Sequence, residues 1–363
     1  MLNKIAAALM VDSLGLRFAG VDPARLPKKF LEFKGPDNTR WSKGSLESDS
    51  GKLSLQVRGF KTTQSIAIAG SPAFHFQGHN IVSSEDVTML SYSAAEAVHR
   101  KFDLGIGKKR AVLFSQGYDI EVTRLDTPIM LSIPDGLNMP AVINAMALSS
   151  ILSGINTSLY VGKTGYVDQH SQLRSLKYYD KAAELSAKKR AVVPNTANGR
   201  ALLDLATTKA RLEAVYRQKY LKRYFIGHAI VTPSMLTPMV MAEMFADLLA
   251  ECDFRRDLRR MLNEEQLMAI PRRFRPTVMY WMHGQNVLKM LDGDESEYSR
   301  HRSFLRNNYK IDIKGPPPTE IENRVELGEI LSPENFVPVP DDIRADPTLY
   351  FDRDMDAERR GLQ

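Results

Sequence analysis

The spacing of apolar positions changes part-way along the chain, and this change predicts two kinds of structure. In the first half, apolar residues tend to alternate with polar ones, as they do in half-buried strands. The clearest examples are residues 10–18, 53–59, 65–69 and 119–126. Beyond residue 232 the apolar residues recur every three or four positions, which is typical of amphipathic helices.

The first half also contains segments with other patterns. We expect helices at 84–100 and 139–152 and strands at 157–160 and 173–179. Residues 204–216 favour a strand, although their alanine and leucine content leaves a helix open. In the second half the expected helices are 235–251, 254–270, 275–291 and 295–308.

Taken together, these elements predict an α+β domain over residues 1–232 and a small helical domain over residues 233–314. A proline-rich tail over residues 315–363 follows. Residues 316–363 hold 12 acidic and 5 basic residues, a net charge of −7. We expect this acidic tail to be partly extended or flexible.

Charge is therefore distributed unevenly. The whole chain carries +6, so residues 1–315 carry +6 − (−7) = +13. A basic body suits a polyanionic partner. Cys252 is the single cysteine, which excludes an internal disulfide and fits a reducing cytoplasm. The apolar run after Lys4 resembles a weak signal peptide, but no small-residue cleavage pattern follows it, so a first helix or strand is expected.

Four residues combine types that phosphate chemistry uses. Asp126 and Glu213 each lie in a strand-like segment, and Tyr178 and Tyr179 come between them. Converging acids would bind Mg²⁺ or Mn²⁺ through oxygen, and a tyrosine beside that ion would attack a polarised phosphate. A phenol has a pKa of about 10, so Lys181 or the metal would have to favour the phenolate. From the residues alone, the more usual alternative stays open, in which the tyrosines only pack and the strand acids only form salt bridges.

Four short segments stand in a distinctive order. Residues 71–81 read Ser-Pro-Ala-Phe-His-Phe-Gln-Gly-His-Asn-Ile, and residues 123–126 read Thr-Arg-Leu-Asp. Residues 179–185 follow the pattern Tyr-x-Lys-x-x-Glu-Leu, and residues 211–222 contain Arg-x-Glu-Ala and then Tyr-Leu-Lys. In this order and spacing, the segments resemble those of the gene II replication proteins of filamentous bacteriophages. The series is also similar to the initiators of small rolling-circle plasmids.

This resemblance implies an HUH-endonuclease-like fold, in which a central antiparallel sheet flanked by helices carries metal ligands and a tyrosine. It implies that Tyr179 is the nucleophile, which forms a 5′-phosphotyrosine and leaves a 3′-hydroxyl primer. Asp126 and Glu213 would bind the metal. Tyr178 would be a second nucleophile or only a neighbour. Because adjacent strand residues point to opposite faces, we expect one of the two tyrosines to face the metal.

One feature departs from the HUH pattern, because the sequence has no His-x-His pair. His79 is the histidine within a matching segment. It is a candidate metal ligand or active-site donor, and the alternative is a structural hydrogen bond. The ligand set therefore stays open.

Basic residues near the proposed site are candidates for DNA contacts. These are Arg124, Arg211, Arg217, Lys219 and Lys222. Phosphate contacts of this kind would give salt-sensitive and mostly sequence-independent affinity. For each residue, a solvated surface position is the alternative.

The expected function is that of a rolling-circle DNA replication initiator. It would perform site-specific, metal-dependent nicking and strand rejoining in the cytoplasm of a bacterial host, with no membrane involved. The implied partners are double-stranded replicative-form DNA at an origin, the displaced single strand, and a host helicase and polymerase. The alternatives are a plasmid-type initiator, a mobilisation relaxase, or a non-catalytic origin-binding protein.

Overall fold

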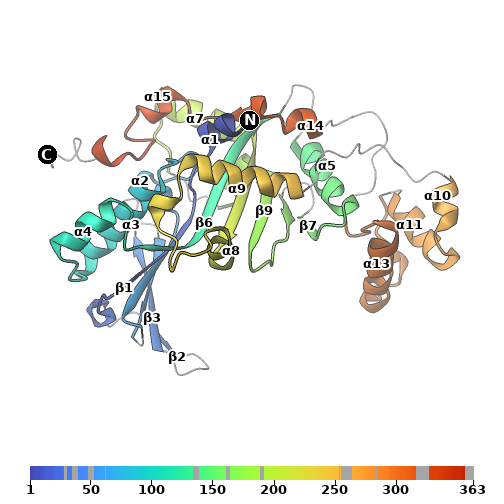
Figure 1. Ribbon diagram of the computed structural model, residues 1–363. Coiled ribbons are helices and arrows are strands. Elements are labelled where there is room, and N and C mark those ends of the chain that lie inside the picture. The colour runs from blue at the N-terminus through green and yellow to red at the C-terminus, as the bar shows by residue number, and fades with distance from the viewer. Residues whose placement is uncertain are drawn as a thin grey trace.

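The fold is seen in a computed structural model, and it belongs to the α+β class (Figure 1). The structure describes residues 1–27, 31–34, 40–47, 53–61, 63–133, 139–160, 164–188, 192–252, 254, 264–282, 284–315 and 327–355. A single large antiparallel sheet, flanked by helices, forms the body of the molecule. The predicted fold class is confirmed, while a closer relation to the HUH endonucleases stays a prediction.

The strands follow the order β2-β3-β4-β5-β1-β6-β10-β9-β8-β7, and β11 pairs with one end of β6. Their bounds are β1 Leu14–Ala19, β2 Leu31–Lys34, β3 Arg40–Glu47, β4 Leu53–Phe60, β5 Ser65–Gly70, β6 Glu121–Ser132, β7 Thr157–Tyr160, β8 Thr164–Val167, β9 Arg174–Asp180, β10 Lys209–Arg217 and β11 Phe336–Val337. The long strand β6 lies between β1 and β10, so residues from the two halves of the sheet meet along it.

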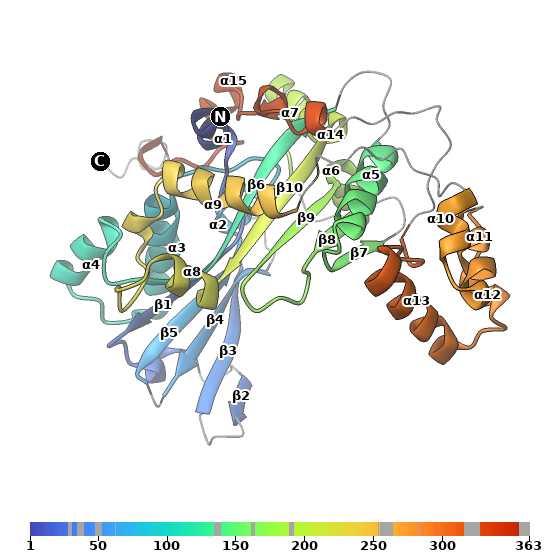
Figure 2. The same ribbon diagram turned by 45° about the vertical axis from the view of Figure 1, so that its right-hand side comes forward.

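Helices cover both faces of the sheet (Figures 1 and 2). Their bounds are α1 Leu2–Ala8, α2 Pro72–Gln77, α3 Val87–Phe102, α4 Lys108–Ser115, α5 Met139–Leu152, α6 Lys181–Lys188, α7 Ala197–Thr208, α8 Gln218–Tyr224, α9 Pro238–Glu251, α10 Glu264–Ala269, α11 Arg275–Met282, α12 Val287–Met290, α13 Glu295–Tyr309, α14 Leu327–Ile330 and α15 Asp341–Arg344. No helix in these described segments is long and apolar enough to cross a membrane.

Two apolar clusters lie on opposite faces of the sheet. The first core combines the strands with α1, α3, α5, α8 and α9. The second core contains Met130 of β6, residues 81 and 82, α7 and part of the segment after residue 327. Strand residues alternate between the two faces. Each face of the sheet is therefore buried in part.

The chain changes from helix to strand inside one predicted element. Residues 204–216 favoured a strand, but α7 runs to Thr208 and β10 begins at Lys209. The apolar residues Leu202 and Ala206 bury one helical face in the second core. From residue 209 onward, the alternate apolar side chains of β10 lie in the first core. The spacing switches from helical to alternating at this point, and a single strand could not accommodate both.

Smaller boundary differences have local causes. The strand expected at 10–18 begins at Leu14, although the backbone of Met10 and Asp12 already bonds to β6. The helix expected from Ser84 begins at Val87, because the side chain of Asp86 caps it by accepting from the Met89 backbone N–H. By contrast, α5 has the predicted bounds 139–152.

The segment around His75 forms the short helix α2. Ser71 caps α2 by accepting from Phe74, and Gly78 ends it in the left-handed region with a φ of 80°. His79 therefore lies beyond the helix that carries His75, and the two histidines do not form a helical metal-binding pair.

Helix α9 packs with the sheet rather than with the helices that follow it. Figure 1 shows α9 crossing in front of the sheet, and Met241 and Phe245 lie in the first core. A separate third core is formed by α11, α13 and their neighbours within residues 264–315, to one side of the sheet (Figure 2). Residues 255–263 of the helix expected at 254–270 lie outside the described residues. The position of the domain boundary stays a prediction.

The described part of the tail is folded, so our expectation of a partly extended or flexible segment is wrong there. Leu349 and Tyr350 are buried in the second core, and β11 pairs with β6. The apolar residues of the tail pack in the second core, and this packing orders the segment although its composition is acidic. Residues 316–326 and 356–363 lie outside the described residues.

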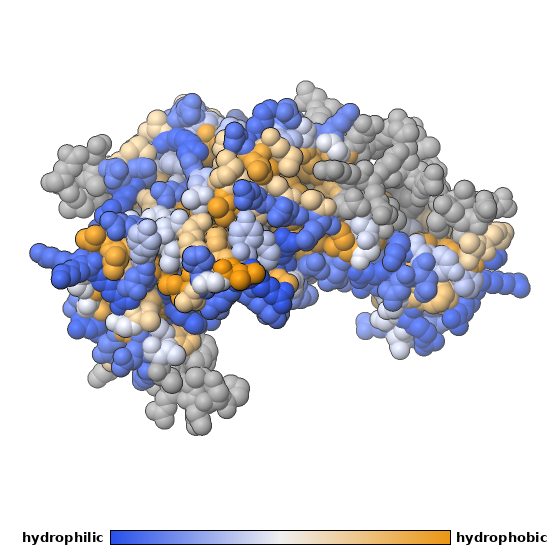
Figure 3. Space-filling view, viewed as in Figure 1, coloured by the Kyte–Doolittle hydropathy of each residue, from blue (hydrophilic) through white to orange (hydrophobic). Residues whose placement is uncertain are grey.

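Exposed apolar residues gather on the side of the molecule on which α9 lies. In Figure 3 they appear as orange atoms gathered along the middle of the molecule, over α9 and just below it. Ile226 is 84 % exposed and Met239 is 40 % exposed. This apolar surface lies on the first-core side of the sheet, opposite the polar residues described next.

Candidate functional site

The two neighbouring tyrosines of β9 point to opposite faces of the sheet, as expected. Tyr178 lies in the first core, edge-on to Phe254 and against the backbone of Gly165. Tyr179 lies on the other face and is 1 % exposed. Its hydroxyl donates a hydrogen bond of 2.9 Å to Oε2 of Glu213. The structure thus brings Tyr179 together with a predicted acid and keeps Tyr178 away from it.

Strand pairing explains this meeting. In the β9–β10 register Arg211 lies opposite Tyr179, and Glu213 lies opposite Lys177. Tyr179 and Glu213 are therefore diagonal neighbours on one face, within reach of long side chains. Burial, followed by the negative charge of Glu213, raises the pKa of Tyr179 well above 10. In this state the hydroxyl is protonated and donates to the carboxylate.

Lys177 is a site residue that the sequence analysis missed. Its Nζ lies 3.7 Å from the centroid of the Tyr179 ring and 4.0 Å from Oε2 of Glu213. The alternation of strand side chains provided the signal, because Lys177 precedes Tyr179 by two residues and shares its face. A cation here acts on both the ring and the acid.

Asp126 of β6 faces the same space and is tied to Arg124. The guanidinium donates two hydrogen bonds to the carboxylate, Nε to Oδ1 at 2.8 Å and Nη2 to Oδ2 at 2.7 Å. The Asp126 side chain is 3 % exposed and that of Arg124 is 48 % exposed. Burial, opposed by Arg124 and reinforced by the charges of Glu213 and Asp12, raises the pKa of Asp126 to about 7.

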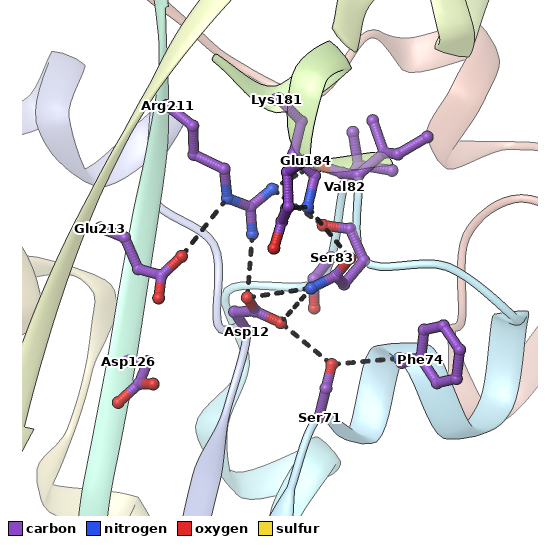
Figure 4. A network of polar contacts seen from close by, with 12 residues as sticks. Asp12, Ser71, Phe74, Val82, Ser83, Asp126, Lys181, Glu184, Arg211 and Glu213 are labelled. Atoms are coloured by element: carbon purple, nitrogen blue, oxygen red, sulfur yellow. Dashed lines mark hydrogen bonds and ion pairs between the residues drawn. The ribbon is translucent and has the colours of Figure 1, made fainter. Parts of the chain in front are cut away.

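Asp12 is a third carboxylate near the tyrosine, and the sequence analysis did not select it. Figure 4 shows Asp12, Asp126 and Glu213 facing one space beside β6. Asp12 accepts hydrogen bonds from Ser71 at 3.0 Å and from Asn80 at 3.0 and 3.1 Å. The sequence gives little indication that Asp12 belongs to the site. Asp12 precedes β1, and backbone pairing with Asp126 brings it there.

Arg211 links Asp12 to the backbone of residues 80 and 81. Its Nη1 donates to the carbonyls of Asn80 and Ile81, each at 2.8 Å, and its Nη2 lies 3.3 Å from Asp12. The side chain is 1 % exposed. The prediction that Arg211 contacts DNA is wrong for this state, because the guanidinium is enclosed by protein acceptors.

Residues 71–81, the longest of the matching segments, form the frame of the site. Ser71 begins α2 and binds Asp12, Gly78 ends the helix, and Asn80 then bridges Asp12 and Lys181. The Asn80 Oδ1 accepts from Lys181 Nζ at 3.1 Å. The segment's sequence is thus explained by a helix cap, a left-handed turn and a bridging amide.

Lys181 is completely buried at the start of α6. Its Nζ bonds to Glu184 at 2.6 Å and to Asn80, and it lies 5.9 Å from the centroid of the Tyr179 ring. Burial and then the charge of Arg211 lower the pKa of Lys181 to about 8. Lys181 therefore contributes positive charge near the ring, while its hydrogen bonds serve the frame.

His79 lies deeper in the protein and is 0 % exposed. Its Nδ1 lies 3.3 Å from Gln77 Nε2 and 3.4 Å from the Ile81 backbone nitrogen, and the ring also hydrogen-bonds to the backbone of Leu349. Burial and then the charge of Lys181 lower its pKa to about 4. These contacts match the structural alternative raised from the sequence.

The predicted metal ligands Asp126, Glu213 and His79 do not form a site as they stand. Within the described segments, no group of three or more His, Cys, Asp or Glu side chains is arranged to hold a metal ion. The carboxylate oxygens are chemically suited to Mg²⁺ or Mn²⁺. The arrangement does not fit, because both Asp126 oxygens are bound to Arg124.

The other predicted DNA-binding residues lie at or near the surface. Arg124, Lys219 and Lys222 are exposed, and Lys222 pairs with Glu121 at 3.2 Å. Arg217 is partly buried and donates to the Ser175 hydroxyl. Arg217 also lies directly opposite Arg124 across β6 and β10, so two guanidinium-bearing residues stand side by side at the edge of the site.

Comparison with known protein families places the chain among phage replication proteins. The profile of the replication-associated protein family, which describes the N-terminal part of the phage gene II protein, matches residues 19–262. The chain belongs to this family. The resemblance to phage replication proteins predicted from the sequence is confirmed, and Tyr179, Glu213 and Asp126 all lie within the matched part of this gene II family protein.

One relative and one solved structure are also similar to the chain. The replication-associated gene II protein of Enterobacteria phage I2-2 is 24 % identical over 287 residues, which cover 74 % of this chain and 80 % of that protein. Among solved structures, the rolling circle replication initiator protein from Geobacillus stearothermophilus matches 71 % of this chain and 89 % of its own, with 12 % identity and a TM-score of 0.34.

Proposed function

We propose that this gene II family protein initiates rolling-circle replication by nicking one strand of origin DNA with Tyr179. The observation that carries the proposal is the hydrogen bond from the Tyr179 hydroxyl to Glu213, on one sheet face with Asp126. A tyrosine paired with a base is the arrangement that a covalent nucleophile requires. Because the chain belongs to a family of replication proteins, the substrate that we propose for this nucleophile is DNA.

The proposed reaction is a transesterification at phosphorus. The Tyr179 oxygen attacks the phosphate and the bond from phosphorus to the 3′-oxygen breaks, so the DNA keeps a 5′-phosphotyrosine and a 3′-hydroxyl. The hydroxyl proton passes to Glu213, and a proton returns to the departing 3′-oxygen. Lys177 and Lys181 place positive charge beside the phenol, which favours the phenolate as it forms. Reversal by a new 3′-hydroxyl would rejoin the displaced strand.

We propose in addition that nicking requires Mg²⁺ or Mn²⁺. Asp126 and Glu213 supply suitable oxygen atoms, but the ion pair with Arg124 has to open first. Host helicase and polymerase likewise remain proposed partners. Arg124, Arg217, Lys219 and Lys222 are the proposed contacts to DNA phosphates, because none of the four side chains is buried.

The test is conversion of supercoiled replicative-form DNA to open circles, using DNA that carries the parent element's intergenic region. The parent protein is expected to nick with Mg²⁺ or Mn²⁺ and to remain attached to the 5′ end. Tyr179→Phe should lose nicking by at least a factor of about 10³, because the attacking oxygen is removed. DNA binding by this variant should be retained.

Tyr178→Phe is the matched control. The Tyr178 hydroxyl is buried and has no hydrogen-bond partner in the described part of the chain. Removing it should leave nicking within about twofold and stability unchanged or slightly increased. Full activity of Tyr179→Phe would remove Tyr179 from the mechanism. Binding without nicking by the parent protein under every metal would instead favour a non-catalytic origin-binding protein.

A further inference from the structure

Ile226 is the most exposed of the large apolar residues in the described part of the chain. It is 84 % exposed, and the next in order, Met1, is 71 % exposed. A single exposed apolar side chain is common on protein surfaces. Ile226 differs because residues 226–230 are exposed throughout and end in a second isoleucine, Ile230. A continuous exposed segment of this kind can serve as an interaction site.

A tight turn holds Ile226 away from the body of the protein. The backbone N–H of His228 donates to the Phe225 carbonyl at 3.3 Å, so Ile226 and Gly227 are the two central residues of the turn. Gly227 has a φ of 92°, which favours glycine at the second of these positions. A Cβ added to Gly227 would have no other atom within 4 Å, so the tip of the turn projects into open space.

Two aromatic residues before the turn fix its position. The rings of Tyr224 and Phe225 pack edge-on with centroids 5.0 Å apart, and both side chains lie against the first core. The Tyr224 hydroxyl donates to Glu243 of α9 at 3.2 Å. Ile226 is therefore an apolar side chain presented on a packed support.

The charge of the chain around this turn favours a polyanionic partner. Residues 214–242 contain four basic residues and no acidic one. The basic residues are Arg217, Lys219, Lys222 and Arg223. Lys222 pairs with Glu121 at 3.2 Å. Lys219 and Arg223 are exposed and form no ion pair within the described segments. Cations beside an exposed apolar side chain match the phosphates and the base stack of DNA.

Helix α8 connects the turn to the edge of the proposed site. The helix follows Arg217, which lies directly opposite Arg124 where β10 pairs with β6. Its seven residues span about 10 Å, so the turn lies one short helix away from these two arginines. A duplex whose phosphates contact both arginines would therefore also reach Ile226.

The proposed nucleophile lies on the other side of the sheet. Leu221 packs α8 into the first core, and Figure 1 shows α8 in front of the sheet, as it does α9. Tyr179 is on the opposite face and is 1 % exposed. Enzymes whose reacting groups are out of reach of an intact duplex act on an extruded or single-stranded substrate. One strand would have to leave the duplex near α8 and pass around the ends of β6 and β10.

We propose that Ile226 is a wedge, which enters the base stack of the origin duplex and opens it beside the nick site. The inference rests on the proposed function and deepens it, because it adds strand separation to cleavage. Isoleucine is one of the apolar side chains that proteins insert between base steps to unstack and kink DNA. Lys219 and Arg223 hold backbone phosphates beside the opened step, and the released strand passes to Tyr179.

The first measurement follows base opening through the fluorescence of 2-aminopurine within a short duplex of the parent element's intergenic region. Tyr179→Phe is the background, so that no DNA is cut. Binding of this protein should raise the fluorescence, and adding Ile226→Ser should remove about nine-tenths of the rise at saturating protein. Ile226→Leu keeps an apolar side chain and should restore it. Val112→Ser, at a position of α4 that is 55 % exposed, should leave the rise unchanged.

The second measurement compares nicking of two DNA substrates by proteins that keep Tyr179. One is the intact supercoiled circle, and the other is a duplex in which the same region is held open by mismatches. Ile226→Ser should lower nicking of the intact circle about tenfold or more, because the side chain that opens the stack is gone. Nicking of the open duplex should stay within about twofold of the parent, since an exposed substitution leaves the fold intact.

The outcomes separate the wedge from the function on which it rests. An unchanged fluorescence rise in Ile226→Ser would overturn the wedge, as would an equal loss of nicking on both substrates, and nicking through Tyr179 would stand. An unchanged rise together with a dimer that becomes a monomer on sedimentation would assign Ile226 to a contact between two copies of the chain. Absence of nicking by the parent protein on both substrates, with the rise lost in Ile226→Ser, would overturn the proposed function and support the wedge.

Discussion

The ionisable residues at the site differ in which neighbouring groups surround them, and these neighbours decide how the charge of each residue depends on pH. Glu213 is bound by Tyr179 and Asp12 by Arg211, whereas His79 is buried beside the positive charge of Lys181. A histidine in such a place is neutral in the folded protein. Protonation therefore favours the unfolded chain, where the ring is exposed to water.

His79 should make the protein sensitive to acid. Its pKa falls from 6.5 to about 4 on folding, so its contribution to stability is present above pH 6.5 and is lost as the pH falls toward 4. Over that window the free energy of unfolding should decrease by on the order of 3 kcal/mol from this residue. His79→Gln should lack that part of the decrease, which urea unfolding at pH 7, 5.5 and 4.5 measures.

The difference between the two unfolding curves isolates His79, because other groups titrate in both proteins. His228→Gln replaces an exposed histidine and should keep the parent's pH dependence. If the His79→Gln and parent curves run parallel from pH 7 to 4.5, the lowered pKa of His79 is wrong.

Single residues were predictable where chemistry and motif coincided. Tyr179, Glu213 and Asp126 stood in matching segments, and the structure brings them to one sheet face. Arg211 was assigned to DNA because charge in a sequence carries no information about burial. Its partners are the carbonyls of Asn80 and Ile81, which lie about 130 positions earlier. Only the tertiary fold brings them together.

Among the elements, α2 shows most directly how local sequence shapes the site. The helix is only six residues long, so its position depends on its ends. Ser71 fixes the start and also binds Asp12, and Gly78 fixes the end and releases the chain toward Asn80. A substitution at either end of α2 should therefore change the position of the carboxylates in the site.

Gly78→Ala should destabilise the protein by about 1–2 kcal/mol, because alanine at a φ of 80° pays the left-handed penalty. The added Cβ would also lie 3.3 Å from the Val192 carbonyl oxygen. Nicking should fall as well, since Asn80 would shift from Asp12 and Lys181. Urea unfolding and the plasmid nicking assay measure the two effects.

Gly328→Ala is the matched control. Gly328 lies in α14 with nothing within 4 Å of an added Cβ, so this change should be neutral or stabilise by up to about 1 kcal/mol. Parent-like stability of Gly78→Ala would mean that the left-handed turn is not required.

Element boundaries were harder to predict than element types. α5 matched its predicted bounds because its apolar run is broken sharply at both ends. The change from α7 to β10 at residue 208 was missed because both elements use alanine and leucine. What separates them is the surface each residue packs against, the second core before residue 208 and the sheet after it.

At the scale of the whole molecule, the chain closes on itself at the second-core face. The segment 327–355 returns to the sheet and meets the motif segment 71–81. Phe351 stacks on Phe76 with ring centroids 4.2 Å apart, and its backbone N–H donates to Gln77 Oε1 at 2.8 Å. Acidic composition suggested a separate tail, but long-range apolar contacts of this kind leave no periodic trace in a sequence.

Phe351→Ala should therefore loosen two distant segments together. Truncating a nearly buried ring costs about 3 kcal/mol, and the loss should appear as faster amide hydrogen exchange in both 327–355 and 71–81. Asp342→Ala, at an exposed position of α15, should change stability by less than about 0.5 kcal/mol and leave both segments protected. If exchange quickens in 327–355 alone, the returning segment merely covers the site. If it quickens in both, the end of the chain helps to hold Asn80, and through it the carboxylates, in position.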